Sequence, residues 1–251
     1  MSKMARPHSE PRRSSAGHRR GPWLHGPIPV IGIAGAIGAG KTKATQILAE
    51  HGAFALDADA IGHALLDQKP QRELVVELFG RSIVRKPTES NPHESIDRAI
   101  LGSIVFANEK SLRGLEEILH PAMHRTFEKA IARESRRHRF RAVLLDAAIL
   151  FEAGWDSLCD ATIFVDAAPE TRAERLRTTR GWTDEMIASR ERMQWSAETK
   201  NAASSYRLEN NGDLDALTHE VIEVWKSILL SKRERYQRTR STPPPLPPSS
   251  E

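Results

Sequence analysis

A segment of eight residues constrains the fold of this chain more than any other feature. It fits the pattern G-x-x-x-x-G-K-[ST] and reads Gly35-Ala36-Ile37-Gly38-Ala39-Gly40-Lys41-Thr42. Because glycine adopts backbone torsions that side chains forbid, successive N–H groups of such a loop can turn inward around phosphate oxygens. An apolar run precedes the segment and a helical pattern follows it, as a phosphate-binding loop requires. A G-x-G-x-x-G dinucleotide-binding spacing cannot be placed over the same glycines.

We expect all eight residues of this loop to bind ATP. The following helix should begin near Lys41, and its N-terminus adds about half a positive charge where the phosphates would lie. Lys41 would hold the β- and γ-phosphates, and Thr42 would ligate Mg²⁺.

Apolar runs alternate with helical patterns from residue 28 onward, which is typical of a parallel sheet with crossover helices. Helical patterns fill roughly 60–138, including a helix capped by Asp97 and another that starts at Pro121. A last helix is predicted over about 213–230. The predicted strands are 28–34, 53–56, 142–145, 161–165 and 206–209. The fold class is therefore α/β, with a five-stranded parallel sheet flanked by helices in the manner of P-loop NTPases.

Acidic residues follow three of the predicted strands, at the sheet edge where open α/β folds bind ligands. Asp57 and Asp59 come after the second strand, and we assign a catalytic role to Asp59 and a helix-capping role to Asp57. Asp146 closes the third strand as a Walker B acid would, which places it near the metal, directly or through water. Glu152, six residues further on, is a less specific candidate.

Six arginines lie between residues 171 and 192. Mobile arginines that close over ATP stabilise charge in the transition state and exclude water. We assign this role to Arg180, which precedes Gly181, and we interpret Arg172, Arg177 and Arg190 as a solvated helix face.

The basic character of the chain comes from its two ends. The net charge of the 251 residues is +4, of which residues 1–27 contribute +5 and residues 232–251 contribute +3, so that 28–231 carries −4. Both ends contain too little apolar surface to offset the entropy of ordering them, and we expect two disordered tails around one folded domain, 28–231. The charge of that domain gives no reason to expect nucleic-acid binding.

The cysteine content and the hydropathy of the chain indicate its cellular compartment. The chain has a single cysteine, Cys159, which excludes an intrachain disulfide and fits a reducing compartment. Its apolar runs are too short to span a bilayer, and no apolar segment of a secretory signal follows the basic start. That Arg- and Ser-rich start also has the composition of an organelle transit peptide, but it lacks the aliphatic face such a peptide needs. We expect a cytoplasmic location and no membrane partner.

In their order along the chain, these residues resemble the dephospho-coenzyme A kinase family. The similarity runs from about Ile31 to Gly212. One departure is Ala148, followed by Ile149, where the family usually has proline before its Leu-Leu-Phe-Glu segment. Besides the loop at 35–42, the similarity rests on Leu56-Asp57-Ala58-Asp59, Ile96-Asp97-Arg98, Val105-Phe106, Leu119-His120-Pro121, Ile149-Leu150-Phe151-Glu152, residues 175–181 and Asn210-Asn211-Gly212.

The resemblance implies a kinase in three parts: a P-loop core, a helical substrate-binding domain near 60–138 and a small lid near 176–195. Such kinases transfer the γ-phosphoryl group of ATP, with Mg²⁺, to the ribose 3′-hydroxyl of dephospho-coenzyme A, the last step of coenzyme A biosynthesis. The resemblance assigns the base to Asp59, the phosphate-binding lysine to Lys41 and the lid arginine to Arg180.

Two alternatives remain open from the residues themselves. One is another P-loop kinase, for a nucleoside or a nucleotide. The other is a non-catalytic ATP-binding module that its basic tails recruit to RNA. The sequence leaves the oligomeric state open, with a monomer preferred.

Overall fold

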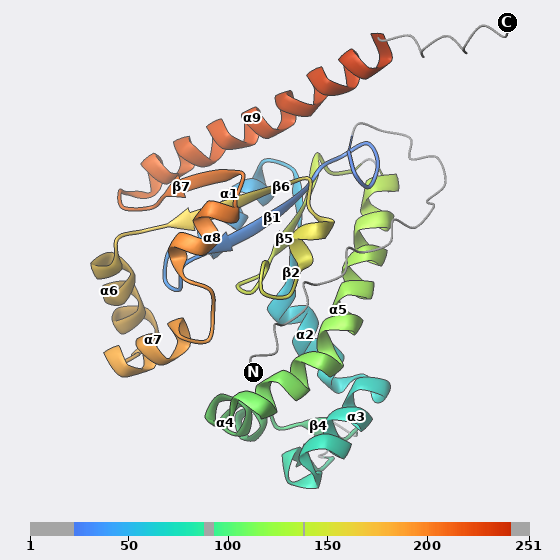
Figure 1. The fold of residues 1–251 in the computed structure, drawn as a ribbon, viewed down its shortest axis with the longest axis vertical. Coiled ribbons are helices and arrows are strands. Elements are labelled where there is room, and N and C mark those ends of the chain that lie inside the picture. The colour runs from blue at the N-terminus through green and yellow to red at the C-terminus, as the bar shows by residue number, and fades with distance from the viewer. Residues whose placement is uncertain (1–22, 88–92, 138, 242–251) are drawn as a thin grey trace, which may run out of the picture.

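A five-stranded parallel sheet forms the centre of the molecule, in the order β2-β5-β1-β6-β7 (Figure 1). The computed structural model describes residues 23–87, 93–137 and 139–241. The five strands are those predicted from the sequence, and their bounds are β1 (Val30–Gly35), β2 (Ala53–Asp57), β5 (Ala142–Asp146), β6 (Ala161–Asp166) and β7 (Tyr206–Glu209).

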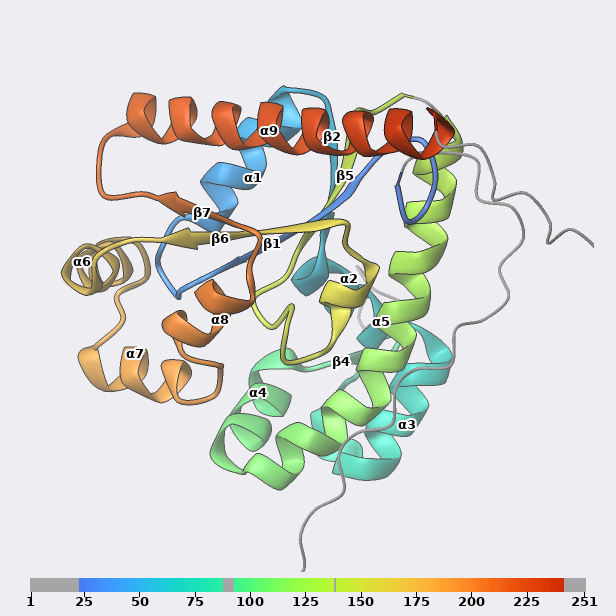
Figure 2. The same cartoon turned by 45° about the horizontal axis from the view of Figure 1, so that its top comes forward.

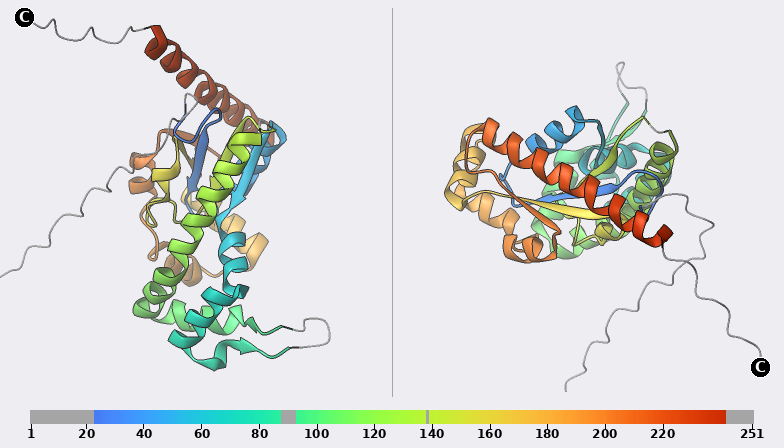
Figure 3. Two further views of the ribbon diagram at one scale, coloured as in Figure 1. Left: turned by 90° about the vertical axis from the view of Figure 1, so that its right-hand side faces the viewer. Right: turned by 90° about the horizontal axis from the view of Figure 1, so that it is seen from above.

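Helices cover both faces of this sheet, which explains why its central strands read as continuous apolar runs. One buried cluster joins the sheet to α1 (Lys41–Glu50) and α9 (Leu214–Ser241). The other joins it to α2 (Ala58–Asp67) and α5 (Glu109–Arg137), with the 3₁₀ turn η2 (Trp155–Leu158) between them. Figures 2 and 3 show α9 lying across the sheet on the side away from α2 and α5.

The helical region after β2 extends away from the sheet. It also contains α3 (Lys69–Phe79), the 3₁₀ turn η1 (Arg81–Ile83) and α4 (Arg98–Ala107), where the side chain of Asp97 accepts hydrogen bonds from the backbone N–H groups of Ala99 and Ile100. This cap confirms the prediction from the sequence. The region is not wholly helical, because β3 (Val84–Arg85) and β4 (Ser95–Ile96) form a short antiparallel pair.

The prediction of a helix start at Pro121 was wrong. Pro121 lies inside α5, which continues from residue 109 to 137 and bends along its length (Figure 1). Proline removes one helical hydrogen bond and costs about 3 kcal/mol. Buried neighbours on both sides, Leu119, Ala122 and Met123, offset that cost by packing in the core.

Both ends of the folded region differ from the predicted bounds. Trp23 is buried and pairs with Gly26 in a β-bridge, so the fold begins before residue 28. At the other end α9 continues to Ser241, beyond the end predicted near Leu230. The rest of the predicted tails, 1–22 and 242–251, lies outside the described residues.

Three short helices follow β6, and the end of the first and all of the second fall in the range 176–195, where the lid was expected. They are α6 (Pro169–Arg180), α7 (Asp184–Glu191) and α8 (Ala197–Ala203). Gly181 ends α6 in the left-handed conformation, with φ of 65°. Within the described part of the chain, no helix is long and apolar enough to cross a membrane.

The packing of α5 on the core gives a stability prediction. Phe127 is fully buried, and its ring packs edge-on against Trp155 with 5.0 Å between ring centroids. We expect Phe127→Ala to lower the free energy of unfolding by about 3–5 kcal/mol, because it removes apolar contacts and leaves a cavity. Leu74→Ala, at a half-exposed position on α3, should change it by less than about 0.5 kcal/mol. Urea unfolding of both variants checks this, and equal losses would contradict the assigned core.

Candidate functional site

The loop from Gly35 to Thr42 leaves β1, enters α1 and contains three backbone donors without a partner among the described residues. Among the described residues, no hydrogen bond is made by the backbone N–H groups of Ile37, Gly38 and Gly40. Gly38 and Gly40 have φ of 79° and 95°, a region that side chains rarely adopt. A Cβ at Gly40 would come within 2.2 Å of Asn210 Nδ2, so this position has no room for a side chain. The loop therefore presents free donors at a helix N-terminus, which suits polyphosphate.

Lys41 is held by the strand beside the loop. Its Nζ donates to Asp146 Oδ1 at 2.6 Å, and Thr45 Oγ1 donates to Asp146 Oδ2 at 2.8 Å. Asp146 is the last residue of β5 and lies opposite Ile33 in the parallel register. The ion pair keeps the ammonium group at the mouth of the loop, where phosphate oxygens can displace the carboxylate as its partner.

Two arginines of α6 contact the loop region, although neither was assigned to the site from the sequence. Arg172 donates to the carbonyl of Ile37 at 3.3 Å and pairs with Glu191, so its interpretation as part of a solvated face was wrong. Arg175 donates through Nη2 to the carbonyl of Asn210, while its buried Nη1 has no partner in the described structure. Nη1 lies 3.9 Å from where a Cβ of Gly40 would be. An unpaired guanidinium nitrogen beside the loop fits a phosphate oxygen.

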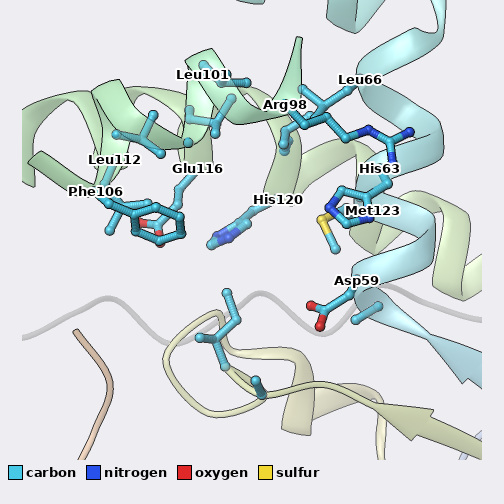
Figure 4. A pocket seen from close by; sticks show the side chains of 18 of the residues that line it. Asp59, His63, Leu66, Arg98, Leu101, Phe106, Leu112, Glu116, His120 and Met123 are labelled. Carbon is cyan, nitrogen blue, oxygen red and sulfur yellow. The ribbon is translucent and has the colours of Figure 1, made fainter. Parts of the chain in front are cut away.

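A pocket of about 270 Å³ lies between α2, α4, α5 and the segment after β5. Apolar side chains such as Leu101 and Met123 form much of its wall. Figure 4 shows Asp59 and Phe106 on opposite sides of the pocket, with His120 between them. Its polar lining residues are Asp59, His63, Arg98, Glu116 and His120.

Asp57 and Asp59 have different surroundings, as the sequence predicted. Asp57 is the N-cap of α2, and its carboxylate accepts a hydrogen bond from the N–H of Ala60 at 3.0 Å. Asp59 lies in the first turn of α2, and its carboxylate points into the pocket (Figure 4). Asp57 pairs in register with Asp146, the partner of Lys41, so the helix that carries Asp59 starts at the same sheet edge as the loop lysine.

Arg180 lies at the end of α6, and its guanidinium contacts Trp182 with 5.1 Å between Cζ and the ring centroid. The described structure gives Arg180 no ion pair. Arg177 pairs with Asp184 on an exposed surface, as a solvated face requires. Arg190 instead lies between two aromatic rings, so that its assignment to a solvated face was wrong.

The oxygen atoms at the loop fit a magnesium ion. Thr42 is exposed at the start of α1, and Asp146 supplies a carboxylate one strand away. Mg²⁺ takes hard oxygen ligands and commonly uses only one or two protein groups beside phosphates and water. Both oxygens of Asp146 accept hydrogen bonds here, and Oδ1 becomes free when Lys41 turns to a phosphate. No cluster of three or more potential metal-binding side chains occurs within residues 23–87, 93–137 and 139–241.

A buried lysine that belongs to no recognisable sequence motif joins the pocket to the segment after α7. Lys200 is 1% exposed, and its Nζ donates to the carbonyl of Ala148 at 2.6 Å and to Gln194 Oε1 at 2.9 Å. It also pairs with Glu152 Oε1 at 2.9 Å, which in turn accepts from the N–H of Trp195. Burial lowers the pKa of Lys200, and the charge of Lys41 adds to this effect while Glu152 opposes it.

The Lys200 network gives a prediction. We expect Lys200→Met to lower the free energy of unfolding by about 3–5 kcal/mol, because it leaves the Glu152 carboxylate largely buried without its cation. The exposed Lys226→Met, which breaks a surface pair with Glu223, should cost less than about 1 kcal/mol. Chemical denaturation measures both. A loss in the free energy of unfolding as small for Lys200→Met as for the control would contradict the assigned network. The same holds if adding Glu152→Gln to Lys200→Met recovers no stability.

Burial shifts the pKa of two titratable side chains in the pocket wall. Burial lowers the pKa of His120, and it raises the pKa of Glu116, partly opposed by Arg113. The ring of His120 also packs edge-on against Trp155, with 5.1 Å between centroids. The pocket therefore favours neutral His120 at neutral pH.

This shift predicts a pH dependence of stability. Because the folded pKa of His120 lies below its ordinary value of 6.5, the unfolded chain binds the proton first as the pH falls. Stability from this group is complete above pH 6.5 and is lost as the pH falls from there through the folded pKa. We expect His120→Asn to reduce the loss of stability between pH 7.5 and 5.5, measured by urea unfolding. His124→Asn, on the same helix but half-exposed, should leave that loss unchanged; an unchanged loss in His120→Asn would contradict the assignment.

Comparisons with known proteins agree with this geometry. Residues 29–234 match the family model described as dephospho-CoA kinase. The chain is 36% identical to a dephospho-CoA kinase of Symbiobacterium thermophilum over 79% of its length and 80% of that protein. It is 35% identical to one of Streptomyces avermitilis, over 79% of this chain and 93% of that one. The crystal structure of TT1252 from Thermus thermophilus superposes with a TM-score of 0.67 at 28% identity, covering 81% of this chain and 99% of the other.

Proposed function

The chain belongs to the dephospho-CoA kinase family, and from this premise we propose how its own residues carry out ATP-dependent phosphorylation of dephospho-CoA. The observation that supports the proposal best is the meeting of two features at one sheet edge. Unpaired N–H groups and Lys41 follow β1 at that edge, and Asp59, which lines the pocket, follows β2, with β5 between the two strands.

The donor nucleotide binds at the loop. The N–H groups of Ile37, Gly38 and Gly40 take phosphate oxygens, together with the other residues of the segment 35–42. Lys41 exchanges its contact with Asp146 for the β- and γ-phosphates. The unpaired Nη1 of Arg175 adds a further donor on the same side of the loop.

Mg²⁺ would be held by the hydroxyl of Thr42 and by the carboxylate of Asp146, directly or through water. When bound, the ion neutralises charge that develops on the transferring phosphoryl group. Asp146 thereby has two functions, since it also places Lys41 before the nucleotide arrives.

The acceptor fills the pocket under α2, with its ribose 3′-hydroxyl at Asp59. The carboxylate of Asp59 accepts the proton of that hydroxyl. At the same time the 3′-oxygen bonds to the γ-phosphorus of ATP, and the bond between this phosphorus and the bridging oxygen breaks to release ADP. Arg98, whose guanidinium pairs with Asp67 at 3.2 Å on the pocket rim, is available to the diphosphate of the acceptor. Arg180 reaches the transferring group when the lid closes and stabilises its charge.

The two carboxylates of α2 give a matched test. We expect Asp59→Asn to lower kcat by about 10²–10⁴-fold, as the loss of a general base does, and to leave the affinity for ATP nearly unchanged. Asp57→Asn should keep kcat within a few-fold, because asparagine caps a helix as well as aspartate does. Steady-state ADP release and ATP titration measure both effects. Normal turnover in Asp59→Asn would remove this residue from the mechanism.

Acceptor choice separates the proposal from its alternatives. ADP should form rapidly with dephospho-CoA and far more slowly with adenosine, with AMP or with no acceptor. Equal rates with adenosine or AMP would favour another nucleoside or nucleotide kinase. Nucleic-acid affinity without ADP formation from any of these acceptors would favour a non-catalytic ATP-binding module. The cytoplasmic location, the monomeric state and the absence of nucleic-acid binding by the core stay predictions.

A further inference from the structure

One contact between the lid and the helical region is formed by Arg190, Trp182 and Phe106. None of these three side chains is assigned above to phosphoryl transfer. Arg190 of α7 has its Cζ 4.4 Å from the ring centroid of Trp182 and 5.1 Å from that of Phe106 on α4. Both distances are within the range of cation–π attraction. Figures 1 and 2 show α7 and α4 at neighbouring corners of the molecule.

Phe106 belongs to this contact and to the acceptor pocket at the same time. It is 52% exposed, although a large apolar ring gains from burial, and it lines the pocket together with Leu112 and Glu116. Figure 4 places it on the side of the pocket opposite Asp59. An acceptor that spans the pocket from its reacting hydroxyl at Asp59 therefore packs against Phe106 at its other end.

Trp182 connects the contact to the lid arginine. It follows Gly181 in the turn between α6 and α7, and its ring has the guanidinium of Arg180 5.1 Å from its centroid. Within the described part of the chain, neither Arg180 nor Arg190 forms an ion pair, whereas Arg172 and Arg177 pair with Glu191 and Asp184. Ring contacts are thus what positions these two guanidinium groups.

We propose that Arg190, held between Trp182 and Phe106, is a positioning residue that couples occupation of the acceptor pocket to closure of the lid. Acceptor bound in the pocket fixes the ring of Phe106, which fixes Arg190 and, through Trp182, places Arg180 over the donor. The coupling is reciprocal, so a closed lid over a bound nucleotide also tightens the acceptor. The inference rests on the proposed function, because it needs the acceptor in this pocket.

The size of the effect follows from the contacts. A cation–π contact at a partly exposed site corresponds to about a two- to fivefold change in an equilibrium constant. We therefore expect a non-hydrolysable ATP analogue to tighten the binding of dephospho-CoA several-fold in the full chain. The mechanism also predicts that acceptor-free hydrolysis of ATP stays slow, because the lid closes less often.

The test measures the dissociation constant of dephospho-CoA by calorimetry, with and without the ATP analogue. Phe106→Leu keeps an apolar pocket wall but loses the ring, and Arg190→Gln loses the cation; each should abolish most of the tightening. Phe106→Tyr keeps an aromatic ring at this position and should retain the tightening. Arg192→Gln, an exposed arginine two residues from Arg190, is the matched control and should retain it too.

The double variant Phe106→Leu/Arg190→Gln provides the decisive comparison. If the two side chains act as one contact, the double variant loses no more tightening than either single variant. The proposal is overturned if the single variants keep the tightening, if their losses add, or if the wild-type chain shows no tightening. Normal turnover without tightening would reject the coupling alone, whereas a wild-type chain that makes no ADP from dephospho-CoA would reject the proposed function.

Discussion

The ion pair between Lys41 and Asp146 is the contact on which the site depends. It joins the first turn of α1 to the end of the neighbouring strand β5, with the two side chains 20% and 15% exposed. The charged ends meet there because β1 and β5 are parallel neighbours, so that the phosphate loop and the Walker-type acid follow carboxyl ends at one edge. The same register places Asp57 beside Asp146, and the helix that Asp57 caps carries Asp59 into the pocket.

The segment after β5 extends this arrangement to the acceptor side. Ala148 and Ile149 line the pocket only a few residues after Asp146, and the Ala148 carbonyl is fixed by the ammonium group of Lys200. Because Lys200 also binds Gln194 and Glu152, it ties the pocket wall to the chain that returns from the lid. A buried ion pair of this kind is a poor source of net stability, but it defines the position of each group it holds. The acceptor pocket and the segment after the lid are therefore joined by the contacts of Lys200.

Much of this was predictable from the sequence, for identifiable reasons. The phosphate loop and all five strands were predicted, because buried parallel strands read as short apolar runs between helices. Asp57 and Asp97 were recognised as caps because aspartate before a helix has a local function. The predicted helix start at Pro121 was wrong, because the cost of a proline inside a helix is outweighed by burial of the residues around it. Arg172, Arg190 and Lys200 could not be placed, because their partners lie far away in the sequence and on other elements.

The central claim is that one sheet edge brings the donor phosphates and the acceptor hydroxyl together. Its most direct test is a crystal structure of the full chain with a non-hydrolysable ATP analogue, Mg²⁺ and dephospho-CoA. We expect the ribose 3′-oxygen within hydrogen-bond distance of the Asp59 carboxylate and in line with the γ-phosphate held by Lys41. An acceptor bound elsewhere, or an Asp59 side chain turned away from that oxygen with the lid closed, would contradict it.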